Sequence, residues 1–174
     1  MRLIDKDLLD DKLGKAGFTA SRLIHKLNYA SGIPALDDML KQDTAPIILI
    51  QRKDGIEISA MTGFFKSVYA GVKYSNIIEV ALEDMEQIYE LKDKSVVGRA
   101  LVGGLLLGPL GAIVGGMTGV KSSHKKADMP DLFLSIRYTS NNEDGILVFT
   151  CKHKDKKDVA SFFKLTCPRL FRVG

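Results

Sequence analysis

The sequence predicts an α+β fold in which a small antiparallel barrel or sandwich is closed by a C-terminal helix. Three observations lead to this prediction. Apolar residues alternate with a period of two in several short runs after residue 46, as is typical of half-buried strands. Residues 155–167 have instead the 3.6-residue period of an amphipathic helix. Between the strand runs lies a long apolar segment, 96–120, that is rich in glycine and fits neither pattern.

The composition is that of a globular protein with one sizeable core. The chain has 174 residues, of which 45% are hydrophobic and 26% charged, and its net charge is +4. This charge is too small to indicate nucleic acid as a partner. The N-terminal residues mix acids and bases without an apolar stretch, so we expect neither a secretory signal nor a transit peptide. We therefore predict a cytoplasmic protein in which Cys151 and Cys167 remain thiols.

Residues 1–45 are predicted to be an N-terminal helical segment that docks on the domain behind it. A first helix ends at Gly14, a second spans residues 19–32, and a third begins after Pro34 and covers residues 35–41. Each has apolar side chains at helical spacing, which are Leu8, Leu9 and Leu13, then Leu23, Ile24, Leu27 and Ala30, and finally Leu36, Met39 and Leu40.

Residues 46–174 are predicted to form the main domain, interrupted by a glycine-rich insertion at 94–127. Asp54-Gly55 is a typical hairpin turn. Strands are expected at 47–51, 56–60, 68–74, 77–82, 88–91, 132–138 and 146–151. In the fourth of these, Ile78, Val80 and Leu82 are expected to face the core. The closing helix follows Asp155 and has one apolar face, formed by Val159, Phe162, Phe163, Thr166 and Cys167.

The insertion has the pattern of two close-packed helices. No charged residue lies between Arg99 and Lys121, and half of the sixteen glycines fall within residues 96–120. Glycines four residues apart form a stripe without side chains on a helix, where a second backbone can approach closely. The Gly-Pro step at 108–109 favours a turn between two halves. The residues predicted to mediate this association are Gly104, Gly108, Pro109, Gly111, Gly115 and Gly119.

Three environments are open to this apolar hairpin. Each half is about 10 residues, or about 15 Å as a helix, and so is too short to cross an apolar layer of about 30 Å alone. The hairpin could pack on its own domain or on another copy of the chain, insert shallowly into a membrane, or span it as one kinked helix. Basic residues flank it and form either a solvated rim or a surface for anionic membranes, namely Lys92, Lys94, Arg99, Lys121, Lys125 and Lys126.

The order of elements resembles a known family. The strings KYSNIIEVAL, SVVGRALVGGLLLGPLGAIVGGMTG, LFLSIRY and ILVFTC, followed by a terminal helix, are similar to small bacterial and phage proteins with a YokE-type pleckstrin-homology-like domain that carries a glycine-rich insert. The resemblance covers about two thirds of the chain and implies a pleckstrin-homology-like β-barrel with a C-terminal capping helix. It implies no catalytic residues. Strands of one sheet on both sides of the insertion would rule out an odd number of membrane crossings, and therefore a single span.

The sequence offers no arrangement of residues that supports catalysis. A near match to a phosphate-binding loop, 115–122, has Val120 where the lysine is required. Cys151 and His153 are expected on one face of a strand with Cys167 near, but this spacing is not that of a zinc site. We therefore predict no enzyme, no cofactor and no metal site.

Two functions follow as hypotheses. The first is a non-catalytic module whose hairpin mediates self-association or contact with the cytoplasmic face of a membrane, with a homo-oligomer expected. The alternative is a bacterial or phage-derived adaptor or inhibitor that binds a host protein through the N-terminal helices and the barrel. Nucleic acid is not expected as a partner, because the basic flanks lack interleaved aromatic residues.

Overall fold

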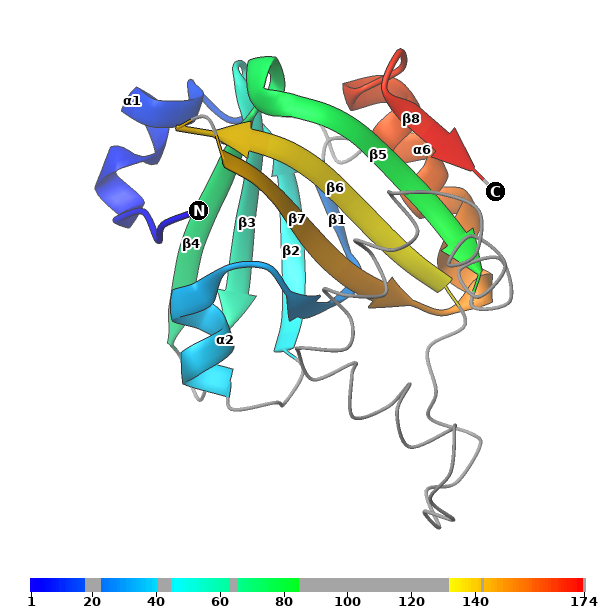
Figure 1. Ribbon diagram of the computed structural model, residues 1–174, viewed down its shortest axis with the longest axis horizontal. Coiled ribbons are helices and arrows are strands. Elements are labelled where there is room, and N and C mark those ends of the chain that lie inside the picture. The colour runs from blue at the N-terminus through cyan, green and yellow to red at the C-terminus, as the bar shows by residue number, and fades with distance from the viewer. Residues whose placement is uncertain (18–22, 41–44, 63–65, 85–131, 142, 174) are drawn as a thin grey trace, which may run out of the picture.

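The computed structural model describes residues 1–17, 23–40, 45–62, 66–84, 132–141 and 143–173, which form an eight-stranded sheet with several helices (Figure 1). The strands are β1 (Leu23–Ser31), β2 (Ala45–Gln51), β3 (Gly55–Met61), β4 (Ser67–Lys73), β5 (Ile77–Asp84), β6 (Leu132–Ser140), β7 (Glu143–Cys151) and β8 (Phe171–Val173). The helices are α1 (Leu9–Leu13), α2 (Pro34–Leu40) and α6 (Lys156–Thr166), with single-turn helices η1 (Lys6–Leu8), η3 (Tyr74–Asn76) and η5 (His153–Asp155).

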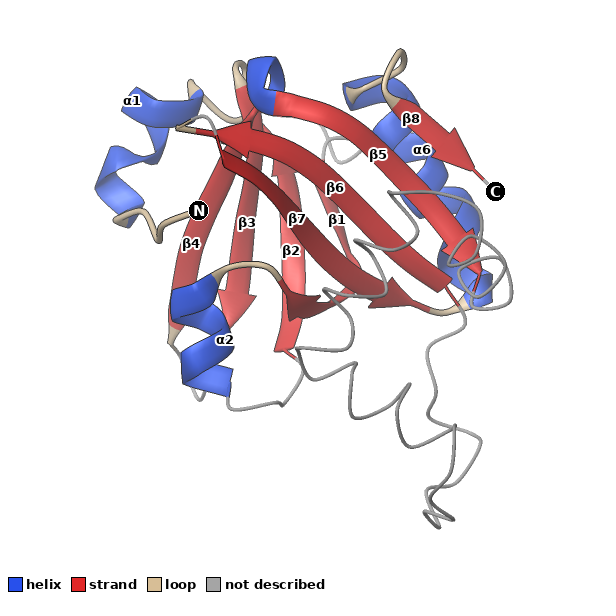
Figure 2. Cartoon of the chain, viewed as in Figure 1, coloured by secondary structure: helices blue, strands red, loops and turns tan. Residues whose placement is uncertain are grey.

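Strand β1 joins two antiparallel meanders into one sheet. The strand order is β4-β3-β2-β1-β7-β6-β5-β8, and all neighbours are antiparallel except β5 and β8. β1 pairs with β2 on one side and with β7 on the other. Figure 2 shows a strongly curved sheet with α1 and α6 at opposite ends of the view. A mainly antiparallel sheet with a C-terminal helix confirms the α+β class, whereas closure of the barrel stays a prediction.

The predicted helix over residues 19–32 is wrong, because residues 23–31 form strand β1. Ile24 and Leu27 are both buried although they are three positions apart, and the β1–β2 register shifts between them. A β-bulge of this kind adds one residue to the alternation, so core-facing side chains acquire a spacing that resembles a helix. The N-terminal segment therefore supplies a central strand as well as helices.

The other two predicted N-terminal helices are confirmed. Helix α1 buries Leu9 and Leu13 and is followed by Gly14, whose φ of 71° suits glycine. Helix α2 begins at Pro34 and buries Leu36. The turn before α2 is fixed by the Tyr29 hydroxyl, which donates a hydrogen bond to the Asp37 carboxylate at 2.6 Å and accepts one from the Ile33 N–H at 2.6 Å.

The strands of the main domain that lie in the described residues occur where they are predicted, with one change of face. Ile78 is 38% exposed whereas Ile77 is 6% exposed, so the prediction that Ile78 faces the core is wrong. The β5–β6 register shifts between Ile77 and Glu79, and this shift reverses the alternation. Strand β8 has no counterpart in the prediction, and the strand expected at 88–91 lies outside the described residues.

The core lies between the curved sheet and α6. The predicted apolar face of α6 is confirmed, since Val159, Phe162 and Phe163 are each at most 2% exposed. The Phe163 ring stacks on Phe171 of β8 with 5.6 Å between ring centroids, which ties the last strand to the helix.

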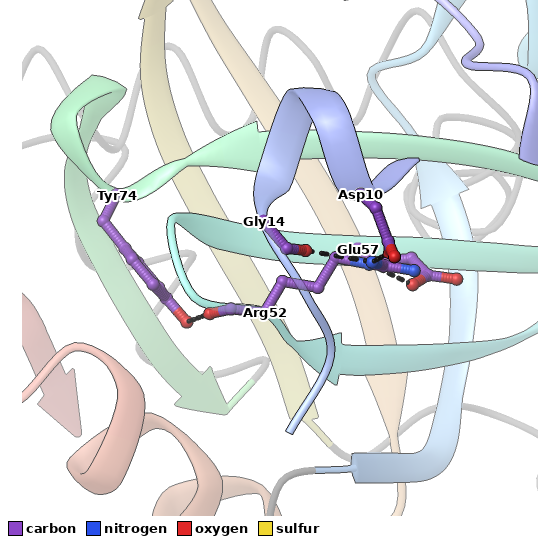
Figure 3. A network of polar contacts seen from close by, with 5 residues as sticks. All are labelled: Asp10, Gly14, Arg52, Glu57 and Tyr74. Atoms are coloured by element: carbon purple, nitrogen blue, oxygen red, sulfur yellow. Dashed lines mark hydrogen bonds and ion pairs between the residues drawn. The ribbon is translucent and has the colours of Figure 1, made fainter. Parts of the chain in front are cut away.

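A buried arginine fastens the α1 segment to the β2–β3 hairpin (Figure 3). Arg52 is 9% exposed; its Nε donates to Glu57 Oε2 at 2.6 Å, and its Nη1 donates to Asp10 Oδ1 at 2.5 Å and to the Gly14 carbonyl at 3.0 Å. The Tyr74 hydroxyl donates to the Arg52 carbonyl at 3.2 Å. Since Glu57 is 3% exposed, the charge of each buried partner is balanced by the other.

We expect Glu57→Gln to lower the free energy of unfolding by about 3 kcal/mol, because it leaves the buried Arg52 guanidinium without its buried counter-charge. Asp10→Asn is the matched control, since the Asp10 side chain is 62% exposed and its loss should cost less than about 1 kcal/mol. Urea unfolding followed by circular dichroism measures both. Equal losses for the two variants would contradict this assignment.

Candidate functional site

The predicted association site lies outside the described residues. This holds for the glycine stripe with its proline (Gly104, Gly108, Pro109, Gly111, Gly115, Gly119) and for the basic flanks (Lys92, Lys94, Arg99, Lys121, Lys125, Lys126). The structure describes the two strands between which this segment is inserted. The geometry of the site is therefore built from its root, which we define as the end of β5 and the start of β6.

The root brings the two ends of the inserted segment together. Asp84 at the end of β5 and Leu132 at the start of β6 are opposite each other in the antiparallel ladder, and the pairing continues through Glu83 with Phe133 and Leu82 with Leu134. The segment 85–131 therefore leaves and re-enters the sheet at neighbouring positions. This meets the condition under which the insertion cannot cross a membrane an odd number of times.

In the part of the chain that the structure describes, no helix combines the length and the apolar character that crossing a bilayer demands.

The elements next to the root carry charge. Leu132 pairs with Cys151, the last residue of β7, and η5 and α6 follow directly. Burial raises the pKa of the Glu83 carboxyl, and the adjacent Asp84 raises it further. Lys26 of β1 reaches across to α6, with its Nζ 2.6 Å from Asp158 Oδ2 and 3.4 Å from Asp155 Oδ1. The hydrogen bond and charge of Asp158 raise the pKa of Lys26, and those of Lys26 lower the pKa of Asp158.

The sulfur and imidazole groups near the root do not share a face. Strand β7 ends at Cys151, which is buried, whereas His153 begins η5 and is exposed, so the expectation that both point to one strand face is wrong. Cys167 is also buried, and neither cysteine forms a disulfide with the other. Burial raises the pKa of the Cys167 thiol, which keeps it in the unreactive protonated form. Among the described residues, no group of three or more His, Cys, Asp or Glu side chains is arranged to bind a metal ion.

The described surface includes the following two hollows. One, of about 670 Å³, lies between the N-terminal residues, the end of β4 and the β6–β7 hairpin, where Lys12, Lys73 and Tyr138 line it with Glu143 and Asp144. The other, of about 360 Å³, is a groove between β1 and α6 that exposes Leu23 and Leu165.

Residues 38–149 match the family described as the glycine zipper containing PH domain, where PH stands for pleckstrin homology. This range is more than half of the chain. The chain belongs to this family. The match to the glycine-zipper PH family runs from within α2 into β7 and includes the insertion, so the predicted PH-like domain with a glycine zipper is confirmed. The YokE-type resemblance and a bacterial or phage origin stay predictions.

No curated protein and no solved structure matches the chain. PH-like domains are generally interaction or binding modules. Membership of this family therefore indicates an interaction or binding role and identifies no partner. Strand β1 and helix α6 lie outside the matched range, although both belong to the same folded unit.

We expect Cys151 and Cys167 to react with Ellman's reagent at pH 8 at least about 100-fold more slowly in the folded protein than in urea, because both thiols are buried. Lys154→Cys places a thiol at an exposed position in η5 and serves as the reactive control. Rapid reaction of either native cysteine in the folded protein would show a reactive thiol and contradict this view.

Proposed function

We propose that this protein is a non-catalytic interaction module of the cytoplasm, in which the PH-like sheet presents the glycine-rich insertion to another copy of the chain or to the inner face of a membrane. The observation that carries the proposal is the pairing of Asp84 with Leu132. Both ends of the insertion meet at one point of the sheet. An apolar hairpin that leaves the sheet at this root therefore has the folded domain on one side only, and its other side faces away from the domain.

The chemistry of the insertion requires a partner surface. A segment with no charge from Ala100 to Val120 cannot remain in water at its full length without exposing an apolar patch of the kind that marks interaction sites. The described core already has its own apolar filling, from Tyr29, Phe149 and Phe163. Glycines at spacings of four allow two helices to approach closely, either within one hairpin or between two copies.

The adaptor hypothesis receives less support from the fold. It assigns partner binding to the N-terminal helices, but several apolar side chains of these elements are used within the domain. Leu9, Leu13 and Leu36 are each at most 2% exposed, and residues 23–31 are a central strand. Part of the apolar surface of this segment is therefore covered by the protein itself, whereas Leu8, Leu23 and Met39 remain 40–50% exposed.

Replacing residues 96–120 by a Gly/Ser segment of equal length tests the proposal. Size-exclusion chromatography with light scattering, with and without detergent, should show assemblies or detergent association for the natural chain and a monomer of about 19.1 kDa for the variant. A natural chain that is monomeric, and whose behaviour does not change with detergent, would contradict the proposal.

The glycine stripe has its own matched control. Gly111→Leu, Gly115→Leu and Gly119→Leu place side chains on the predicted contact stripe and should disrupt assembly. The same change at Gly98, Gly103 and Gly116 adds equal apolar bulk off the stripe and should preserve it. If both sets act alike, the stripe is not the contact.

A further inference from the structure

The larger of the two hollows lies away from the root of the insertion. Its volume of about 670 Å³ falls within the range of about 300–1,000 Å³ that is usual for small-molecule sites. We call it the Tyr138 hollow, after the residue of β6 that lines it. Leu132 of the root begins the same strand, and at about 3.3 Å per residue Tyr138 lies about 20 Å further along it. A ligand in this hollow is therefore separate from the insertion.

The Tyr138 hollow is enclosed by segments that are far apart in the chain. On one side, the Ile4 N–H donates a hydrogen bond to the Tyr69 carbonyl at 2.7 Å, which holds the first residues along β4. Leu13 of α1 packs so closely over Gly71 of β4 that a Cβ added there would collide with its methyl groups. On the other side is the β6–β7 hairpin, and Figure 1 shows α1 and the end of β6 on the same side of the view. The N-terminal wall precedes the range that matches the family, so this hollow is not a feature of the matched domain alone.

Tyr138 places in this hollow a hydroxyl that has no partner within the described residues. Tyr138 is 4% exposed, and no hydrogen bond of the described residues involves its side chain. Its cross-strand partner is Gly145, where an added Cβ would collide with the tyrosine ring, so the glycine makes room for the ring. No described side-chain oxygen or nitrogen is both fully enclosed and without a partner, so the hydroxyl opens into the hollow. Burial raises the pKa of Tyr138, which keeps the hydroxyl protonated and able to donate.

Three basic side chains line the hollow from different elements. They are Arg2 of the N-terminal segment, Lys12 of α1 and Lys73 of β4, and all three are exposed. The ion pairs between described residues involve none of them. Their charges are therefore available to a bound anion.

The carboxylates of the lining offset this charge only in part. Asp144 is already engaged, because it accepts a hydrogen bond from the Thr139 hydroxyl at 3.0 Å and lies 3.9 Å from Arg137 Nη2. The other carboxylate is that of Glu143, which is exposed on the β6–β7 hairpin. One carboxylate thus remains against three cations, and an anion fits this hollow better than a cation does.

Apolar side chains complete the lining. Leu13 and Val72 are 2% and 3% exposed, and Leu3 is partly buried against the core. Together with the Tyr138 ring they give the hollow an apolar wall beside its cations. Small-molecule sites typically combine such a wall with a few polar groups that fix the orientation of the ligand.

We propose that the Tyr138 hollow binds a small, soluble organic carboxylate with an apolar body. The cations and the Tyr138 hydroxyl hold the carboxylate, and the apolar body lies against Leu3, Leu13 and Val72. A hydrogen bond to a charged acceptor is about twice as strong as one between neutral groups. This binding activity goes beyond the interaction function proposed above, because it needs neither the insertion nor its root.

Phosphate, free or in a lipid headgroup, fits this hollow less well. Phosphate sites commonly present backbone N–H groups from a glycine-rich loop or from the N-terminus of a helix. The glycines of this lining, Gly71 and Gly145, lie instead within the β3–β4 and β6–β7 ladders. Phosphate also has no apolar part to cover Leu13 and Val72. The lining therefore favours an organic carboxylate.

Binding of naphthalene-2-carboxylate to the full chain tests the inference. The chain has no tryptophan, so the fluorescence anisotropy of this probe can be followed without tryptophan emission. We expect saturable binding of the probe. The neutral naphthalene-2-carboxamide should compete at least about 10-fold more weakly than unlabelled carboxylate of the same shape, because it lacks the charge that the cations recognise.

Two variants and a matched control locate the site. Tyr138→Phe removes only the hydroxyl and should weaken binding of the probe about 10-fold. Lys12→Gln/Lys73→Gln should weaken it at least about 10-fold. Lys6→Gln/Lys15→Gln removes two exposed lysines of the same N-terminal segment that do not line the hollow, and should bind the probe like the natural chain.

Each other outcome overturns the inference. A natural chain that shows no saturable binding, a carboxamide that competes equally well, or equal affinities of the lysine variant and its control would each do so. Displacement of the probe by an equal concentration of inorganic phosphate would replace the organic carboxylate by phosphate, and displacement only by vesicles containing phosphatidylglycerol would replace it by a lipid headgroup. Thermal unfolding of Tyr138→Phe should match that of the natural chain, and a lower midpoint would assign the hydroxyl to the fold instead of to a ligand.

Discussion

The antiparallel pairing of β5 with β6 is the constraint on which the rest of this structure depends. These strands are neighbours in the sheet although residues 85–131 separate them in the chain. The pairing closes this long connection at Asp84 and Leu132, at an entropic cost that grows only slowly with the length of the connection. A domain can therefore carry a large insertion here while its core, built from β1–β8 and α6, keeps its own contacts. We propose that the sheet does not need the insertion, which leaves this segment to serve an external surface.

The sequence predicted those elements whose pattern is local. The hairpin at Asp54-Gly55, the strands on either side of the insertion and the apolar face of α6 all follow from short periodic runs. The errors occur where a β-bulge changes the period. In β1 the register shift between Ile24 and Leu27 produces helical spacing in a strand, and in β5 a shift after Ile77 exposes Ile78. A bulge depends on the partner strand, so one segment read alone does not show it.

The candidate site was predictable only in part for the same reason. The glycine stripe and its flanking basic residues are close together in the chain, so sequence analysis could predict them, and they stay a prediction because they lie outside the described residues. Helix α6 is separated from them in sequence, and the pairing of Leu132 with Cys151 brings its start close to the root. Asp155 and Asp158, at the start of α6, are paired with Lys26, which is more than a hundred residues away in the chain, and no local pattern predicts that contact. Likewise, Asp10 binds Arg52 and Asp37 binds Tyr29, which gives structural roles to acids that have no catalytic partner.

The most direct measurement concerns the independence of the core from the insertion. Replacing residues 85–131 by Asn-Gly joins Asp84 and Leu132 through the shortest common hairpin turn. If the core is complete without the insertion, urea unfolding should stay cooperative and the free energy of unfolding should rise by about 2–3 kcal/mol, because the closed connection is far shorter. A variant that unfolds without cooperativity, or that loses several kcal/mol of stability, would show that the insertion is part of the core and would contradict the account.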